Sequence, residues 1–471
     1  TLLFGAFIFN KPDVAVARWA EFETVVVEGG TSPLVRLQLL QKYVSGSRKN
    51  DDESTYRSSF MLKIVADAIK QQDSSKLLVA GLGVYEQFVA ATWMVAIKDE
   101  AAAHVSHIFG HCSSNNPSVS VASFRALAEM CSQCLRSNCG MALVELQQFC
   151  EKAADLVSYG MASPKANVKS TAIFAAGNLA LAIIREHEET EEALISSERF
   201  DELCRFSLKL LDDVNEKVVS NTIRAIGHFA RLSYNEPFGQ LYSESNHDDQ
   251  FFDVAVRSLS LVLETGVQDA RGRVAGRTWK QRSIAKKHAW GASSTFGVFL
   301  RSQVVWKHRE VSQFAFRQLV DCLAPTFSLN HKIRRGAVES LAHIPTKTLQ
   351  FLSGCSGVVG IAVAYCLKRP TGTPAKDLDA ALTVNLCGAL TKTDACALLR
   401  YLEDEDAMLV TVYERLCEPQ ETASAVEAMA VALVEQHDPK YVVWHQRFTS
   451  RALQLSRELG KAASENDEDE L

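Results

Sequence analysis

The chain has 471 residues, of which 47% are apolar, and it contains 24 glycines and only 11 prolines. These values exclude a disordered or collagen-like chain, and the low proline content favours helices. The net charge of −6 does not indicate a nucleic-acid-binding protein. The longest apolar runs, at 1–9 and 357–367, are shorter than the ~20 residues of a membrane-spanning helix, so we expect no transmembrane segment.

The 12 cysteines show no pairing pattern, which favours reduced thiols and an intracellular protein, cytoplasmic or nuclear. Because the sequence starts at Thr1 rather than at a methionine, an upstream targeting segment and an organellar location stay open.

A helical pattern recurs from the beginning of the chain. Weak copies begin near Val35, Leu77 and Val119, each with apolar or small residues at the fifth and ninth positions. A stronger copy at 168–179, VKSTAIFAAGNL, aligns without gaps on 218–229, VVSNTIRAIGHF. Their first, fifth, ninth and twelfth positions lie on one helix face, which predicts an apolar stripe that packs on a neighbouring helix.

Two more copies follow, at 288–299 and 333–344, the second closed by Pro345. The seven starts are separated by 42, 42, 49, 50, 70 and 45 residues, mostly near the roughly 40 to 47 residues of a helix-pair repeat. We expect the longest step to contain an exposed loop at 233–250, which is rich in acidic and turn-forming residues. Helix pairs that cannot bury their apolar faces alone stack into a solenoid.

These copies resemble the second helix of HEAT repeats over roughly residues 30 to 350. A narrower resemblance, to the family of HEAT-repeat-containing protein six, rests on two helices. The matching residues are Lys287, Trp290, Ala292 and Gly297 in the first helix, and Lys332, Ile333, Arg334, Ala337 and Pro345 in the second. His288 and Ala289 depart from that family's Val-Arg. The resemblance implies an all-α HEAT/armadillo-like solenoid over residues 1–368, with a binding role and no catalytic residues.

The pattern becomes irregular towards the C-terminus. Residues 369–377, RPTGTPAKD, have the composition of a linker, and apolar helical stripes return over 378–463. We expect 369–463 to form further helical repeats or a cap, and 464–471 to form an acidic disordered tail.

A basic stretch is the most distinctive feature of the sequence. Residues 270–309 contain ten lysines or arginines and neither Asp nor Glu, so the remainder of the chain has a net charge of −16. Gly272 and Gly276 predict a loop that leads into a helix. With the basic residues of the next copy, the predicted partner-binding residues are Arg271, Arg273, Arg277, Lys280, Arg282, Lys286, Lys287, Lys332, Arg334 and Arg335.

Three interpretations of this stretch stay open. It binds a protein partner with an acidic surface, it binds RNA or a ribonucleoprotein, or it is a solvated face whose tryptophans lie in the core. We favour the protein partner over RNA, because no RNA-binding motif such as a GXXG loop is present.

A zinc site can be drawn from His104, His107, His111, Cys112, Cys131, Cys134 and Cys139, but the spacing fits known zinc motifs poorly. His288 lies on the apolar stripe, with no acid before Glu310, which favours a packing role over that of a general base. No nucleotide-binding or hydrolase motif occurs. We therefore predict a non-enzymatic scaffold without cofactor, metal, small-molecule substrate or membrane span.

Overall fold

The computed structural model describes residues 32–47, 63–70, 74–96, 101–134, 142–190, 192–234, 248–270, 272–324, 331–354 and 357–367, with single positions between 382 and 394. These residues form helices and turns, and no strand occurs among them, so the predicted all-α class is confirmed for this part. The tail, most of 369–463 and residues 235–247 of the expected loop lie outside it. The chain divides into two compact units, Thr1–Phe251 and Phe252–Leu471.

The first unit is a succession of helices, and five of the predicted repeat starts lie within the first three residues of one. After α4 comes a short helix at 63–70, followed by longer helices that are joined by turns. The bounds are α4 Pro33–Ser47, α6 Ser75–Ala96, α7 Ala101–Cys112, α8 Pro117–Cys134, α9 Leu143–Met161, α10 Ala166–Thr190, α11 Ser197–Leu210 and α12 Glu216–Tyr234.

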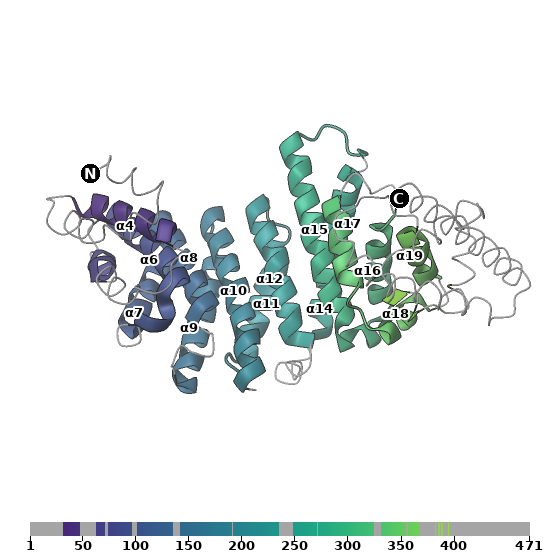
Figure 1. The fold of residues 1–471 in the computed structure, drawn as a ribbon, viewed down its shortest axis with the longest axis horizontal. Coiled ribbons are helices and arrows are strands. Elements are labelled where there is room, and N and C mark those ends of the chain that lie inside the picture. Colours follow the sequence, from purple (N-terminus) through teal and green to yellow (C-terminus); the bar gives the residue numbers. More distant parts are fainter. Residues whose placement is uncertain are drawn as a thin grey trace, which may run out of the picture. The chain divides into compact units, whose positions relative to one another are not determined.

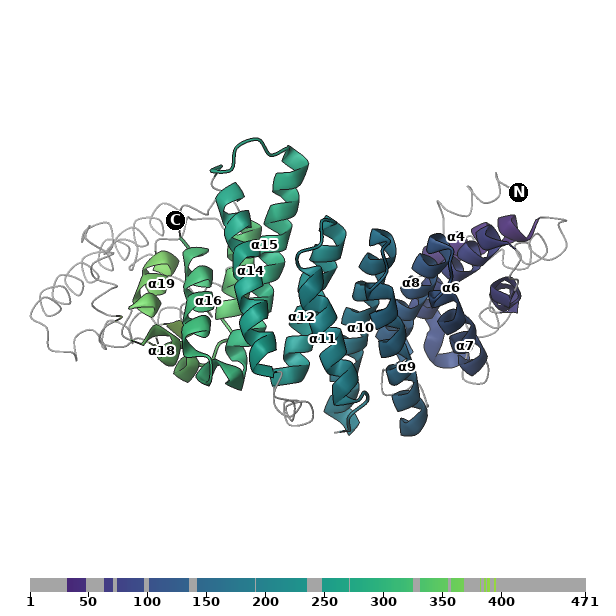
Figure 2. The same cartoon turned by 180° about the vertical axis from the view of Figure 1, so that it is seen from behind.

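These helices form two rows (Figure 1 and Figure 2). In one row α4, α6, α8, α10 and α12 each pack on the next, and in the other α7 packs on α9 and α9 on α11. Consecutive helices α7 and α8, α9 and α10, and α11 and α12 also pack together, so the rows are linked by helical pairs. The core of this unit lies between the rows, where the predicted stripes of α10 and α12 are buried.

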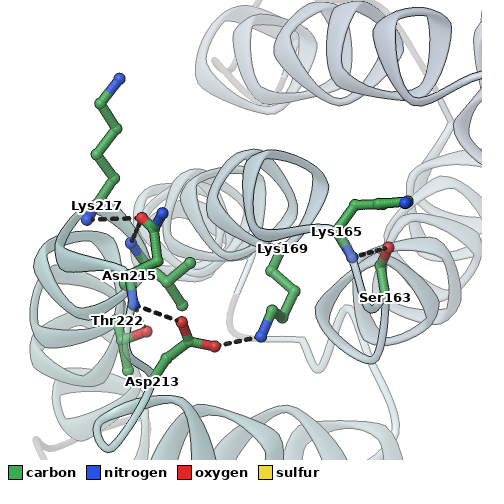
Figure 3. Close-up of polar contacts among 8 residues, drawn as sticks. Ser163, Lys165, Lys169, Asp213, Asn215, Lys217 and Thr222 are labelled. Carbon is green, nitrogen blue, oxygen red and sulfur yellow. Dashed lines mark hydrogen bonds and ion pairs between the residues drawn. The ribbon is translucent and has the colours of Figure 1, made fainter.

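The turns that precede α8, α10 and α12 share one type of hydrogen bond. In each, a side-chain oxygen accepts a hydrogen bond from the backbone N–H two residues later: Ser114 from Asn116 at 3.2 Å, Ser163 from Lys165 at 3.2 Å and Asp213 from Asn215 at 2.8 Å. Asp213 also accepts from Lys169 of α10 (Figure 3). That ion pair ties the turn before α12 to the preceding repeat copy.

Helix α10 has an apolar stretch, Ala166–Glu186, whose length and hydropathy would suffice to cross a membrane. In this unit 72% of that stretch is buried, by packing on α8, α9 and α12. Its apolar composition is thus accounted for by contacts inside the unit.

The second unit begins within α14 (Asp248–Ala270) and continues with α15 (Trp279–Arg301) and the 3-10 helix η1 (Gln303–Trp306). The remaining helices are α16 Arg309–Asp321, α17 His331–Leu341, α18 Thr346–Ser353 and α19 Val358–Leu367. Helix α15 packs on α16 and α17, and Phe252 of α14 contacts Phe299 edge to face, with ring centroids 5.2 Å apart. The core of this unit surrounds α15.

Helix α15 begins nine residues before the predicted repeat start at 288. The side chain of Thr278 accepts from the Gln281 N–H, and Gln281 Oε1 accepts from the Thr278 N–H at 2.9 Å. This reciprocal capping box satisfies free N–H groups of the first turn, so the helix starts at Trp279. The stripe predicted from residue 288, at Ala292, Phe296 and Phe299, is confirmed as buried.

Candidate functional site

The basic stretch is organised around the first half of α15. The preceding loop turns at Gly272 and Gly276, which have φ angles of +69° and +78°, a conformation that glycine adopts at little cost. Arg277 pairs with the buried carboxylate of Asp269 at the end of α14. The predicted loop is therefore present, and one of its cations is used to hold it against α14.

Six of the predicted partner-binding residues have exposed side chains: Arg273, Lys280, Arg282, Lys287, Lys332 and Arg335. Arg277 and Lys286 are half-buried, and Arg271 lies outside the described residues. Arg335 donates to Glu339 at 2.7 Å in an exposed i,i+4 pair, which holds the guanidinium only weakly.

The prediction that Arg334 lies on the surface, where a partner could contact it, is wrong. Arg334 is only 6% exposed, because it faces the interior side of α17 beside the buried Ile333. Its basic character in the sequence suggested a surface position, but two residues adjacent on a helix point about 100° apart, and the apolar stripe of α17 is wide enough to include it. Lys332 and Arg335 remain as the surface cations of this helix.

The tryptophans are exposed, which corrects the interpretation that placed them in the core. Trp279 is 83% exposed and Trp290 is 41% exposed, although Trp290 lies directly over Gly336 of α17. Trp306, beyond the end of α15, is 50% exposed and packs on Phe351 with ring centroids 4.3 Å apart.

Helices α15 and α17 run parallel, because Trp290 lies over Gly336 and Gly297 lies against Ser340. Lys332 precedes Gly336 by one turn, so it lies on the side of α17 that faces Trp290. The first turns of α15 extend beyond the N-terminus of α17. The resulting surface, called the α15/α17 face below, consists of Trp279, Lys280, Arg282, Lys287, Trp290, Lys332 and Arg335.

The residues drawn as a possible zinc site do not form one where the structure describes them. No group of three or more potential ligands occurs among the described residues. His111 Nε2 lies 3.1 Å from the Ile69 carbonyl oxygen, and Cys112 and Cys131 are buried. Burial raises the pKa of both thiols far above the usual value, which opposes the thiolate form that zinc binds. Cys139 and the side chains of His104 and Cys134 lie outside the described part.

A cavity of about 320 Å³ lies between the turn that precedes α8 and the turn that precedes α10. Its lining contains hydroxyl groups, the Cys112 thiol and Lys165, with no carboxylate or histidine among the lining residues. His288, the residue weighed as a general base, is half-buried on α15.

The structure also shows a basic cluster that the sequence analysis missed, on α10 and α12 of the first unit. Arg224, His228 and Arg231 share one face of α12 and are half-buried, whereas Arg185 on α10 is exposed. Burial, and then the charges of Arg224, Arg231 and Arg185, lower the pKa of His228 to about 3. The sequence pattern that could have revealed this cluster is the i, i+4, i+7 spacing of Arg224, His228 and Arg231, which lie outside the apolar stripe of α12.

Comparisons with known proteins give no name to this architecture. No protein-family model and no curated protein matches the chain. Among solved structures, two engineered proteins are similar at 12% identity, with TM-scores of 0.40 and 0.35. The alignments cover 87% and 58% of this chain and 97% of each engineered chain.

Proposed function

We propose that the chain is a non-enzymatic interaction scaffold that binds an acidic protein partner through the α15/α17 face. The observation that supports this function is the grouping of five exposed cations with two exposed tryptophans on neighbouring helices. Clustered cations attract an acidic surface and set its orientation, and tryptophan and arginine are the residues that most often dominate protein interfaces.

The same proposal includes a HEAT/armadillo-like solenoid as the supporting architecture, within an intracellular complex. Stacked helical pairs in the first unit support it, as do buried stripes at equal positions of several helices. A shared register supports it further. Gly177 faces Ala225 of the next copy, and Gly297 faces Ser340 at the equivalent positions.

The experiment is a pull-down from native lysate with wild-type protein and two matched variants. The face variant carries Lys280→Glu, Lys287→Glu, Lys332→Glu and Arg335→Glu, and the control variant reverses the exposed Lys76, Lys152, Lys209 and Lys217. We expect specific proteins to be lost from the face variant and retained by the control, with unchanged circular dichroism for both. Equal recovery with both variants would show that the face is solvated surface.

RNA binding is the second candidate, and the exposure of Trp279 is the observation that favours it. Bases of single-stranded RNA stack on exposed aromatic rings beside cations. A fluorescent uridine 20-mer distinguishes the candidates. If RNA is the ligand, the affinity falls steeply with salt and drops by about tenfold or more in Trp279→Ala. If the partner is a protein, this RNA binds weakly and Trp279→Ala does not change its affinity.

A further inference from the structure

The cluster on α10 and α12 contains a guanidinium group that is fixed by uncharged neighbours. Arg224 Nη2 donates to Asn178 Oδ1 at 2.7 Å, and Arg224 Cζ lies 4.8 Å from the centre of the Phe174 ring. Asn178 is buried and donates from Nδ2 to the Ala128 carbonyl of α8 at 2.9 Å, which fixes the orientation of its amide. Arg224 is therefore held in place without a carboxylate.

The positive charge of this cluster is not neutralised inside the described part of the protein. Arg224, Arg185 and Arg231 form no ion pair with any described residue. Described acidic side chains on the cluster's own helices are Glu186 of α10, which is buried, and Glu216 at the start of α12, while Glu129 lies on the adjacent α8. An arginine has five N–H donors, and Arg224 uses one of them in its bond to Asn178. No described residue accepts from the remaining donors or from those of Arg185 and Arg231, so an anionic ligand can accept from them.

The spacing of the cations indicates the kind of anion. Arg224 and Arg231 are seven residues apart on α12, which corresponds to about 10 Å along the helix axis. One carboxylate or phosphate group does not span this distance. In an extended peptide, residues two or three apart are separated by roughly 7 to 10 Å, which is comparable to the rise between the two arginines along α12.

The aromatic content argues against single-stranded nucleic acid at this surface. Phe174 is the one described aromatic ring at the cluster apart from His228, and Arg224 covers one side of it. Stacking of bases requires open aromatic rings, such as those of Trp279 and Trp290 in the second unit.

We propose that Arg185, Arg224 and Arg231 form a second binding surface, and that its ligand is an extended acidic peptide segment of a protein partner. Carboxylates of this segment accept charge-assisted hydrogen bonds from Arg224 and Arg231, while Arg185 contributes from α10. The surface lies entirely in the first unit. It therefore does not depend on the function proposed for the α15/α17 face.

The test uses the full chain with Lys280→Gln, Arg282→Gln, Lys287→Gln, Lys332→Gln and Arg335→Gln as a common background, which removes the five cations of the α15/α17 face. The probe is fluorescein-labelled hexaglutamate at low ionic strength. We expect Arg224→Gln with Arg231→Gln to weaken binding by about tenfold or more, as for loss of hydrogen bonds between charged groups. The control removes the same charge on α11, with Arg205→Gln and Lys209→Gln, and should change affinity by less than about twofold.

Two further measurements separate a binding role from a structural one. Arg185→Gln with Arg231→Gln leaves the Arg224 contacts intact and should also weaken binding several-fold. The ring signals of His228, assigned with His228→Gln, should shift on addition of hexaglutamate. The proposal is overturned if the α11 control weakens binding equally, or if the His228 signals do not move. It is also overturned if a uridine 10-mer binds more tightly than hexaglutamate with the same dependence on these arginines.

Discussion

His228 illustrates at the residue scale how its neighbours set the charge of a side chain. Its pKa in the folded protein is about 3, against 6.5 as the usual value, so between these values the unfolded chain binds a proton that the folded chain does not. The free energy of unfolding therefore rises with pH through this window. Stability from this group is complete above pH 6.5 and is lost as the pH falls towards 3.

We predict that wild-type protein loses about 2 kcal/mol more stability than His228→Gln when the pH falls from 7 to 5. Urea denaturation of both proteins at the two pH values measures the difference. Equal losses would mean that His228 is protonated in the folded state, and thus that it is less buried and farther from the arginines than the structure places it.

Cys112 and Cys131 give a second prediction at this scale. Burial raises the pKa of both thiols, and the thiolate is the reactive form. We expect iodoacetamide to modify both cysteines in the native protein about tenfold or more slowly than in urea, as measured by mass spectrometry of the two peptides. Equal rates would contradict their burial, and stoichiometric zinc released on unfolding would contradict protonated thiols.

At the scale of single helices, the contacts of a repeat position differ even where the residue is the same. Gly177 and Gly297 both occupy the tenth position of a repeat copy. A Cβ at Gly177 would lie 3.4 Å from Ala225 Cα, whereas a Cβ at Gly297 would lie 2.6 Å from Ser340 Cβ and 2.8 Å from Ser340 Cα. Both distances at Gly297 are too short for contacts between carbon atoms, so α17 would have to move.

We predict that Gly297→Ala destabilises the protein by about 2 kcal/mol through overpacking. Gly177→Ala should stay within about 1 kcal/mol of wild type, because the higher helix propensity of alanine offsets a tight contact. Thermal or urea unfolding of the two variants tests the pair. Equal destabilisation by both would show that the two helix contacts are equally close.

Helix faces were the part that the sequence could predict, since a buried stripe repeats its apolar residues every three or four positions. The stripes that start at Val168, Val218 and Ile333 are buried as expected. Limits of such a stripe are harder to predict, because a long side chain at its edge can be included, as Arg334 is, or excluded, as Trp279 is. The arginines around His228 come from two helices. Their proximity depends on how α10 and α12 are aligned along their axes, and the sequence of either helix alone does not specify this alignment.

At the scale of the whole chain, the separation into two compact units has a testable consequence for folding. Helices α6 to α12 bury their apolar stripes against one another within the first unit. A core that is complete within one unit is expected to fold by itself. We predict that a chain ending at residue 240 keeps helical circular dichroism and unfolds cooperatively on heating. A fragment without a cooperative transition would show that this core needs residues of the second unit.

The unequal exposure of Trp279 and Trp290 also makes ligand binding at the α15/α17 face detectable by tryptophan fluorescence. An indole in water emits at longer wavelength than one that is covered, so a ligand seated on Trp279 should shift its emission to the blue. Subtracting the spectrum of Trp279→Phe isolates this contribution from the other five tryptophans of the chain. Unlabelled protein can thus report occupancy of this face during a titration, before the ligand has been identified.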